Sequence, residues 1–251
     1  MKIRKRNIVP SLFTMLNLFF GFFAIVNALR GNFVAASWFI ILAAIWDVLD
    51  GRIARLTHTH SEFGIEFDSL ADVVSFGVAP SILIYQIYFD NFFDKLEAFG
   101  VILSFFPLLF GAIRLARFNV NIDGFEKENF TGLPIPATAV TLASYVIFNY
   151  DLWEGLKFGS LLIPLVLLLS FLMVSNIEYQ TMPKFSFRVN RKNSIQFLLV
   201  ILGVTIILIF QEKAMFPLVF GFVLYYLFRA ILHSLKEEDE EEEVFDVSIS
   251  D

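Results

Sequence analysis

Four aspartates lie within one short stretch of an otherwise apolar sequence. Asp47 and Asp50 are three residues apart, and Asp68 and Asp72 are four apart. On α-helices, both spacings place the two carboxylates of a pair on one face. Two consecutive antiparallel helices can bring all four carboxylates to one point. Carboxylate oxygens favour hard divalent cations, so the pattern predicts a site for two ions of Mg²⁺ or Mn²⁺.

Small residues and an arginine accompany the aspartates. Gly51 directly follows the second aspartate, Ala54 lies about one turn further on, and Gly64 lies one turn before the third. Small side chains at these positions allow a ligand to approach the helix backbone closely. Arg55 is of the type that pairs with phosphate. Two metal ions, an open groove and an arginine together suit a diphosphate ligand.

Two other interpretations of the aspartates must be weighed. Aspartates in a membrane can be structural, with Arg52 or Arg55 as neutralising partners, and carboxylates near the midplane also serve ion-coupled transporters. Neither interpretation requires small residues at the positions of Gly51, Ala54 and Gly64. The combination therefore favours an enzyme.

The composition predicts a membrane protein. The 251 residues are 57% hydrophobic and 18% charged, and their mean hydropathy is +0.69. A soluble domain has about half apolar and about a quarter charged residues. We expect an all-α polytopic fold with one membrane-embedded catalytic domain over residues 1–236. A span needs about 20 apolar residues, and eight stretches are candidates: 9–29, 33–56, 66–89, 97–118, 134–150, 157–177, 194–211 and 214–233.

The distribution of charge predicts the orientation. With eight spans and a cytoplasmic N-terminus, 15 of the 19 Lys and Arg residues fall on the cytoplasmic side, as the positive-inside rule requires. The site and both termini then face the cytoplasm from the cell membrane. Residues 237–251 are acidic, and their composition predicts a disordered tail. The net charge is −6, and we expect no nucleic-acid partner.

The complete spacing is more specific than any of its parts. This stretch resembles the signature of the CDP-alcohol phosphotransferase family at every position: Asp47-x2-Asp50-Gly51-x2-Ala54-Arg55-x8-Gly64-x3-Asp68-x3-Asp72. The resemblance implies that the four aspartates hold the two cations and that Asp72 is also the general base. It further implies a CDP-binding role for the small residues and the arginine: Gly51, Ala54, Arg55 and Gly64.

Other segments resemble one branch of that family, the membrane-type phosphatidylserine synthases of bacteria and archaea. These segments are NIVPSLFTMLNLFFGFFAI, RLARFNV, FTGLPIPATA and LMVSNIEYQTMPK. The resemblance implies CDP-diacylglycerol and L-serine as substrates, membrane lipid as the surroundings, and a homodimer. The same chemistry on another alcohol, such as glycerol 3-phosphate or an inositol phosphate, stays open at this point.

Four further polar residues have two interpretations each. Arg114 and Arg117 could bind the serine carboxylate, or they could follow the positive-inside rule or bind lipid phosphate. Thr14 and Asn17 lie about one turn apart in the apolar first helix. The family resemblance favours a place in the nucleotide groove for them, and hydrogen bonding between helices is the alternative.

Overall fold

Helices make up almost all of the part of the chain that the structure describes. The computed structural model describes residues 8–57, 62–92, 97–120, 129–157, 159–180, 202–203, 205–206 and 209–249. The first two helices, α1 (Ile8–Leu29) and α2 (Phe33–Thr57), form an antiparallel hairpin. Gly31 makes the turn with a positive φ of 76°, a conformation that glycine adopts without steric cost.

Small residues bring α1 and α2 close together. Ala24 and Ala28 on α1, and Ala36 and Ala43 on α2, have no exposed surface. In membranes, such positions allow backbones to approach closely, and packing contacts then stabilise the helix pair. Towards the far end of the hairpin, the rings of Phe20 and Trp46 stack with their centroids 6.3 Å apart. The hairpin therefore holds the segment before Asp47 firmly against α1.

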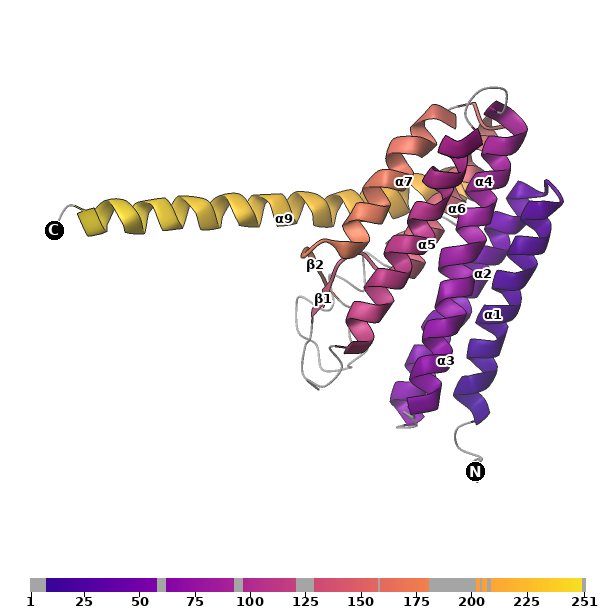
Figure 1. The fold of residues 1–251 in the computed structure, drawn as a ribbon, viewed down its shortest axis with the longest axis horizontal. Helices are drawn as coiled ribbons and strands as arrows, with labels where there is room; N and C mark the ends of the chain where they lie inside the picture. The colour runs from indigo at the N-terminus through magenta and orange to yellow at the C-terminus, as the bar shows by residue number, and fades with distance from the viewer. Residues whose placement is uncertain are drawn as a thin grey trace.

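A long composite helix follows the hairpin. It consists of α3 (Glu62–Asp72), the π-helical segment η2 (Val73–Val78) and α4 (Ala79–Phe92). The next helix, α5 (Glu97–Val120), returns antiparallel to it, so the end of α5 lies at the same end of the bundle as the start of α3 (Figure 1). The backbone packs tightly here, because a Cβ added at Gly77 would lie 3.0 Å from Leu108.

A small two-stranded sheet joins segments that lie before and after two of the helices. Strand β1 (Asn129–Thr131) pairs antiparallel with β2 (Glu178–Gln180), and Phe130 is opposite Tyr179. Between the two strands lie α6 (Ile135–Trp153) and α7 (Gly159–Val174). Pro134 caps the start of α6, where proline is well tolerated because its missing N–H would have no helical partner.

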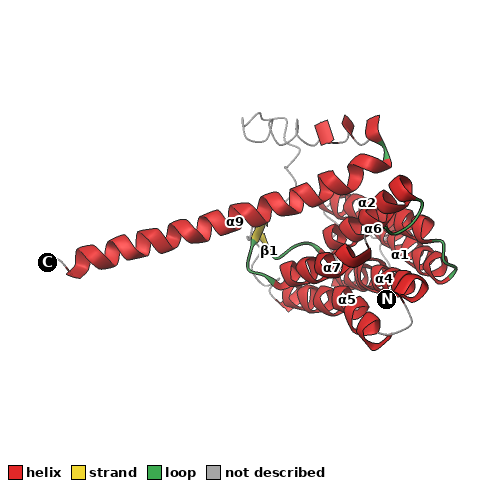
Figure 2. Cartoon of the chain, turned by 90° about the horizontal axis from the view of Figure 1, so that it is seen from above, coloured by secondary structure: helices red, strands yellow, loops and turns green. Residues whose placement is uncertain are grey.

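The last described helix, α9 (Glu212–Ile249), starts against α6 and extends far beyond the bundle (Figures 1 and 2). The backbone of α9 is helical as far as Ile249, and the disorder expected for residues 237–251 stays a prediction. Glutamate has a high helix propensity and an existing helix extends at little cost, which accounts for a helical backbone in this acidic segment.

The described part of the chain contains five helices long and apolar enough to cross a membrane, together with the shorter α7, Gly159–Val174. The five segments are Leu12–Leu29, Phe33–Ala54, Phe63–Tyr88, Phe99–Val120 and Glu212–Leu232. The predicted all-α membrane fold is confirmed, whereas the count of eight spans is not. Most of the candidate span 194–211 lies outside the described residues.

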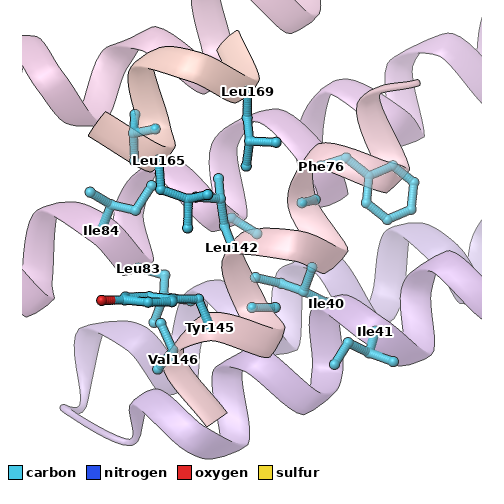
Figure 3. Packing of buried hydrophobic residues seen from close by; sticks show 14 of the residues in the cluster. Ile40, Ile41, Phe76, Leu83, Ile84, Leu142, Tyr145, Val146, Leu165 and Leu169 are labelled. Atoms are coloured by element: carbon cyan, nitrogen blue, oxygen red, sulfur yellow. The ribbon is translucent and has the colours of Figure 1, made fainter. Parts of the chain in front are cut away.

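Helix α6 runs through the middle of the apolar core. Figure 3 shows its Leu142 and Tyr145 among side chains of the neighbouring helices, including Ile40 from α2, Leu83 from α4 and Leu165 from α7. By contrast, α1 and α5 keep many large apolar side chains exposed, as expected for surfaces that face lipid. The aspartates lie on α2 and α3, and α1 packs against both of these helices.

Candidate active site

Three of the four aspartates meet between α2 and α3. One carboxylate oxygen each from Asp47, Asp68 and Asp72 lies within 4.8 Å of the other two. Among the described residues, Oδ1 of Asp68 is buried and has no hydrogen-bond partner. Three carboxylates at this separation repel one another, and a buried oxygen without a partner is costly. A divalent cation would remove both costs, so the residues present fit a metal ion of the hard, oxygen-binding class.

The fourth aspartate is held differently. Asp50 is only 6% exposed, and its Oδ2 accepts a hydrogen bond from the hydroxyl of Thr14 on α1. Asp50 does not belong to the group of three carboxylates that the described residues form. Its place one turn after Asp47 on α2 still puts it beside that group. Its predicted role as a fourth ligand stays a prediction.

Asn17 on α1 contacts the last aspartate of the motif. Its Nδ2 donates a hydrogen bond to Oδ1 of Asp72 over 3.2 Å. The Asn17 side chain has no exposed surface, and Asp72 is 8% exposed. Thr14 and Asn17 therefore each bind an aspartate of the motif. Of their two interpretations, the structure gives both residues a hydrogen bond between helices, while a contact with the nucleotide stays a prediction.

The small residues of the motif lie on the same two helices. Gly51 is exposed and Ala54 is half-buried on α2, and Gly64 is half-buried in the first turn of α3. Arg55 belongs to the C-terminal end of α2, and its side chain lies outside the part of the chain that the structure describes. The CDP-binding role of these four residues stays a prediction.

The two arginines of α5 have different surroundings. Arg114 is half-buried and interacts electrostatically with Asp72. Its Nε is buried and finds no hydrogen-bond partner among the described residues. Arg117 is exposed, and its Nη1 donates to the carbonyl oxygen of Val174 at the end of α7 over 2.9 Å. Only Arg114 is therefore brought towards the carboxylates.

Two side-chain links were not foreseen from the sequence. Ser75, on the π-helical segment, donates from Oγ to the backbone carbonyl of Asn17 over 3.0 Å. Ser69 on α3 and Asn119 near the end of α5 are hydrogen-bonded to each other, with Asn119 Nδ2 3.1 Å from Ser69 Oγ. Ser75 could have been noticed as the one polar residue in the run VVSFGV after Asp72. The Ser69–Asn119 link depends on the tertiary fold and leaves no local signal.

Comparison with known proteins identifies the family. The family model for CDP-alcohol phosphatidyltransferases matches residues 7–175, which include the whole aspartate motif and both arginines of α5. The chain belongs to the CDP-alcohol phosphatidyltransferase family. Members of this family are enzymes, and they generally depend on divalent metal ions, in keeping with the carboxylate cluster.

Similar curated proteins of this family come from bacteria and archaea. A CDP-diacylglycerol–serine O-phosphatidyltransferase of Helicobacter pylori strain J99 is 38% identical over 238 residues, which cover 94% of this chain and 96% of the relative. A protein of the same name from H. pylori strain 26695 is 44% identical over 186 residues, which cover 73% of this chain and 76% of that relative. An archaetidylserine synthase of Methanothermobacter thermautotrophicus is 39% identical over 174 residues, which cover 68% of this chain and 69% of that relative.

Proposed function

We propose that this chain is a CDP-diacylglycerol–serine O-phosphatidyltransferase, which makes phosphatidylserine and CMP. The observation that carries the proposal is the meeting of Asp47, Asp68 and Asp72 within 4.8 Å between two membrane helices. That site belongs to a family of CDP-alcohol enzymes, and relatives that match most of the chain are named for serine as acceptor. An ion-coupled transporter, the alternative from another class, does not fit membership of this family.

The site would hold two divalent cations, Mg²⁺ or Mn²⁺. Their ligands would be the carboxylates of Asp47, Asp68 and Asp72, with Asp50 beside them. Such ions would neutralise the diphosphate of the CDP-lipid and stabilise CMP as it leaves. The protein's own contribution is to fix three oxygens from two helices at one point. Thr14 supports this arrangement, because its hydroxyl holds the carboxylate of Asp50.

Asp72 would act as the general base. In the reaction, the serine hydroxyl oxygen forms a bond to the phosphorus that bears the lipid. The bond from that phosphorus to the oxygen of CMP breaks, and CMP leaves with the electron pair. The hydroxyl proton passes to the carboxylate of Asp72, as a base within hydrogen-bond reach can accept it while the new bond forms. Asp72 is 8% exposed, so water competes little for its proton-accepting oxygen.

Arg114 is the better of the two arginines for the serine carboxylate. It is the one near Asp72, and its Nε is buried without a partner among the described residues. A guanidinium can bind a carboxylate through two parallel hydrogen bonds. Serine held in this way by Arg114 would have its hydroxyl close to the proposed base. On the other side of the aspartates, the CDP moiety would be bordered by Gly51, Ala54, Arg55 and Gly64.

Location and assembly follow from the same proposal. The apolar helices make the chain an integral membrane protein, and we place its aspartate end on the cytoplasmic side of the cell membrane because the cations concentrate there. The homodimer implied by the family resemblance stays a prediction. Its check is the mass of the purified protein in a defined detergent, measured with the bound detergent subtracted.

Product analysis with purified protein tests the proposal. CDP-diacylglycerol, Mg²⁺ or Mn²⁺, and one acceptor at a time would be supplied: L-serine, glycerol 3-phosphate or an inositol phosphate. Phosphatidylserine together with CMP, formed from serine alone, is the expected result. Product from another acceptor would keep the mechanism and overturn the assignment of serine. No CMP release with any acceptor would overturn the function.

A further inference from the structure

A chain of three contacts leads from the π-helical segment to the proposed base. Ser75 Oγ donates to the backbone carbonyl of Asn17 over 3.0 Å, and Asn17 Nδ2 donates to Oδ1 of Asp72 over 3.2 Å. Ser75 and Asn17 have no exposed surface. These contacts join α1 to the end of α3 through residues that are 55 and 58 positions apart in the sequence.

The third contact is steric. A Cβ added at Gly21 would meet Ser75, coming within 2.7 Å of its Cα and 2.8 Å of its Cβ. Contacts under about 3 Å do not occur between such carbon atoms, whose optimal separation is roughly 3.5–4.0 Å. Glycine at position 21 therefore allows α1 to approach the π-helical segment. That approach brings the Asn17 carbonyl within reach of the Ser75 hydroxyl.

The chemistry of the amide fixes how Asn17 must face the carboxylate. An ionised carboxylate only accepts hydrogen bonds, so the NH₂ end of the amide must point towards it. The bond to Oδ1 restricts rotation of the Asp72 carboxyl group and leaves the lone pairs of its second oxygen for a metal ion and the acceptor hydroxyl. Asn17 Oδ1 is buried and lacks a hydrogen-bond partner among the described residues. Such a cost at a fully buried position fits a side chain retained for its contact with Asp72.

We propose that Asn17 is a positioning residue, which orients the carboxylate of Asp72 towards the acceptor hydroxyl, and that Ser75 on the π-helical segment holds Asn17 in place. The inference rests on the proposed role of Asp72 in phosphatidyl transfer. It gives the π-helical segment a role as well, because π-helical turns occur frequently at functional sites. Asn17 acts only through Asp72, so its removal should change the rate of the chemical step more than the binding of either substrate.

The test compares Asn17→Leu, Ser75→Ala and Ser37→Ala with the wild type. Asn17→Leu keeps the side-chain size and removes the donor. Ser37 is the matched control, because it is fully buried and its hydroxyl donates to the Phe33 carbonyl within α2. We expect kcat to fall about 10- to 100-fold in Asn17→Leu, as for other residues that orient an active-site ligand. Ser75→Ala should lower kcat several-fold, and Ser37→Ala should leave it unchanged.

Two further readouts separate positioning from a general loss of folding. The KM values for serine and CDP-diacylglycerol should stay within about threefold of wild type, and the stoichiometry of CDP-diacylglycerol binding should be unchanged, if Asn17 acts through Asp72. A direct contact of Asn17 with the nucleotide, the role predicted from the sequence, would instead raise the KM for CDP-diacylglycerol. The double variant Asn17→Leu/Asp72→Asn should be no slower than Asp72→Asn alone, since two residues acting through one group are not additive.

The outcomes that overturn the inference differ from those that overturn the function. Wild-type protein without CMP release would contradict the proposed function. If the wild type is active, the inference fails when Asn17→Leu keeps its kcat, or when it raises a KM and leaves kcat unchanged. It also fails when the losses of Asn17→Leu and Asp72→Asn multiply in the double variant. Should Asn17→Leu not fold, an unchanged kcat in Ser75→Ala would contradict the role of Ser75 and, with it, the proposed chain of contacts.

Discussion

Arg117 donates a hydrogen bond to the carbonyl oxygen of Val174, so the end of α5 is tied to the end of α7. Val174 is the last residue of α7, where helical carbonyls lack backbone partners and favour a cation. Arg114, about one turn earlier on α5, interacts electrostatically with Asp72. The two arginines of one motif therefore have separate tasks, and substitution should separate them.

Arg114→Lys should raise the KM for serine about 10- to 100-fold, because a hydrogen bond to a charged group contributes about 1.5–3 kcal/mol and lysine cannot reproduce the two-pronged geometry. The KM for CDP-diacylglycerol should change little. Arg117→Lys is the matched control: we expect an unchanged KM for serine and a loss of about 1 kcal/mol in stability. Initial rates over a serine series measure both, and an equal effect of the two variants would contradict the assignment.

Asp72→Asn should reduce turnover to a small residual rate and leave the binding of CDP-diacylglycerol largely intact. The amide keeps the shape of the carboxyl group and cannot accept the proton, and general bases contribute about 10²- to 10⁴-fold in rate. Equilibrium binding of the CDP-lipid, measured beside CMP release, checks this. A loss of binding as large as the loss of rate would make Asp72 a binding residue and refute its role as base.

Removal of divalent ions should stop the reaction. A chelator is expected to abolish CMP release, and added Mg²⁺ or Mn²⁺ should restore it, because the clustered carboxylates need a cation between them. Asp68→Asn should raise the Mn²⁺ concentration needed for half-maximal activity at least several-fold, and it should weaken Mn²⁺ binding measured by electron paramagnetic resonance. Asp151→Asn, at an exposed position of α6, is the control and should leave both values unchanged.

Gly132→Ala should destabilise the protein, while Gly155→Ala should not. Gly132 has a positive φ of 80°, and a Cβ there would collide with the carbonyl oxygen of Met173. The backbone conformation alone costs alanine about 1–2 kcal/mol, and the collision adds to it. A Cβ at Gly155 would meet nothing within 4 Å, so we expect a change within about 0.5 kcal/mol. Thermal unfolding in detergent compares the two variants, and equal melting temperatures would contradict the prediction.

The sequence predicted the part of the site that depends on local spacing. Helical periodicity alone indicated that Asp68 and Asp72 share a face, and the structure places both with Asp47. The difference between Arg114 and Arg117 could not be predicted in this way. It depends on where α7 ends relative to α5, a relation between segments that are 57 residues apart.

Some features of the fold could likewise be predicted from the sequence, and others could not. Apolar length predicted the helices of the α1–α2 hairpin to within one residue, and the ends of the long helix after it to within four. The sequence prediction did not detect the π-helical turn at Val73–Val78, because its composition is that of any apolar helix. A helical backbone as far as Ile249 was not predicted for the acidic segment of α9. Its repeated glutamates were interpreted as a source of repulsion, although each is also a good helix former.

The π-helical turn at Val73–Val78 makes the composite helix sensitive to the number of residues in that turn. A wide turn of this kind accommodates one additional residue, and each residue of an α-helix advances the chain by about 100° around the axis. The aspartates of α3 can therefore face α2 and α1 while α4 independently buries Leu83 and Ile87. Deletion of a single residue here would leave every aspartate and the hydropathy intact, yet it would rotate one half of the helix against the other. In comparisons among relatives, a gap in this segment would therefore matter more than most substitutions.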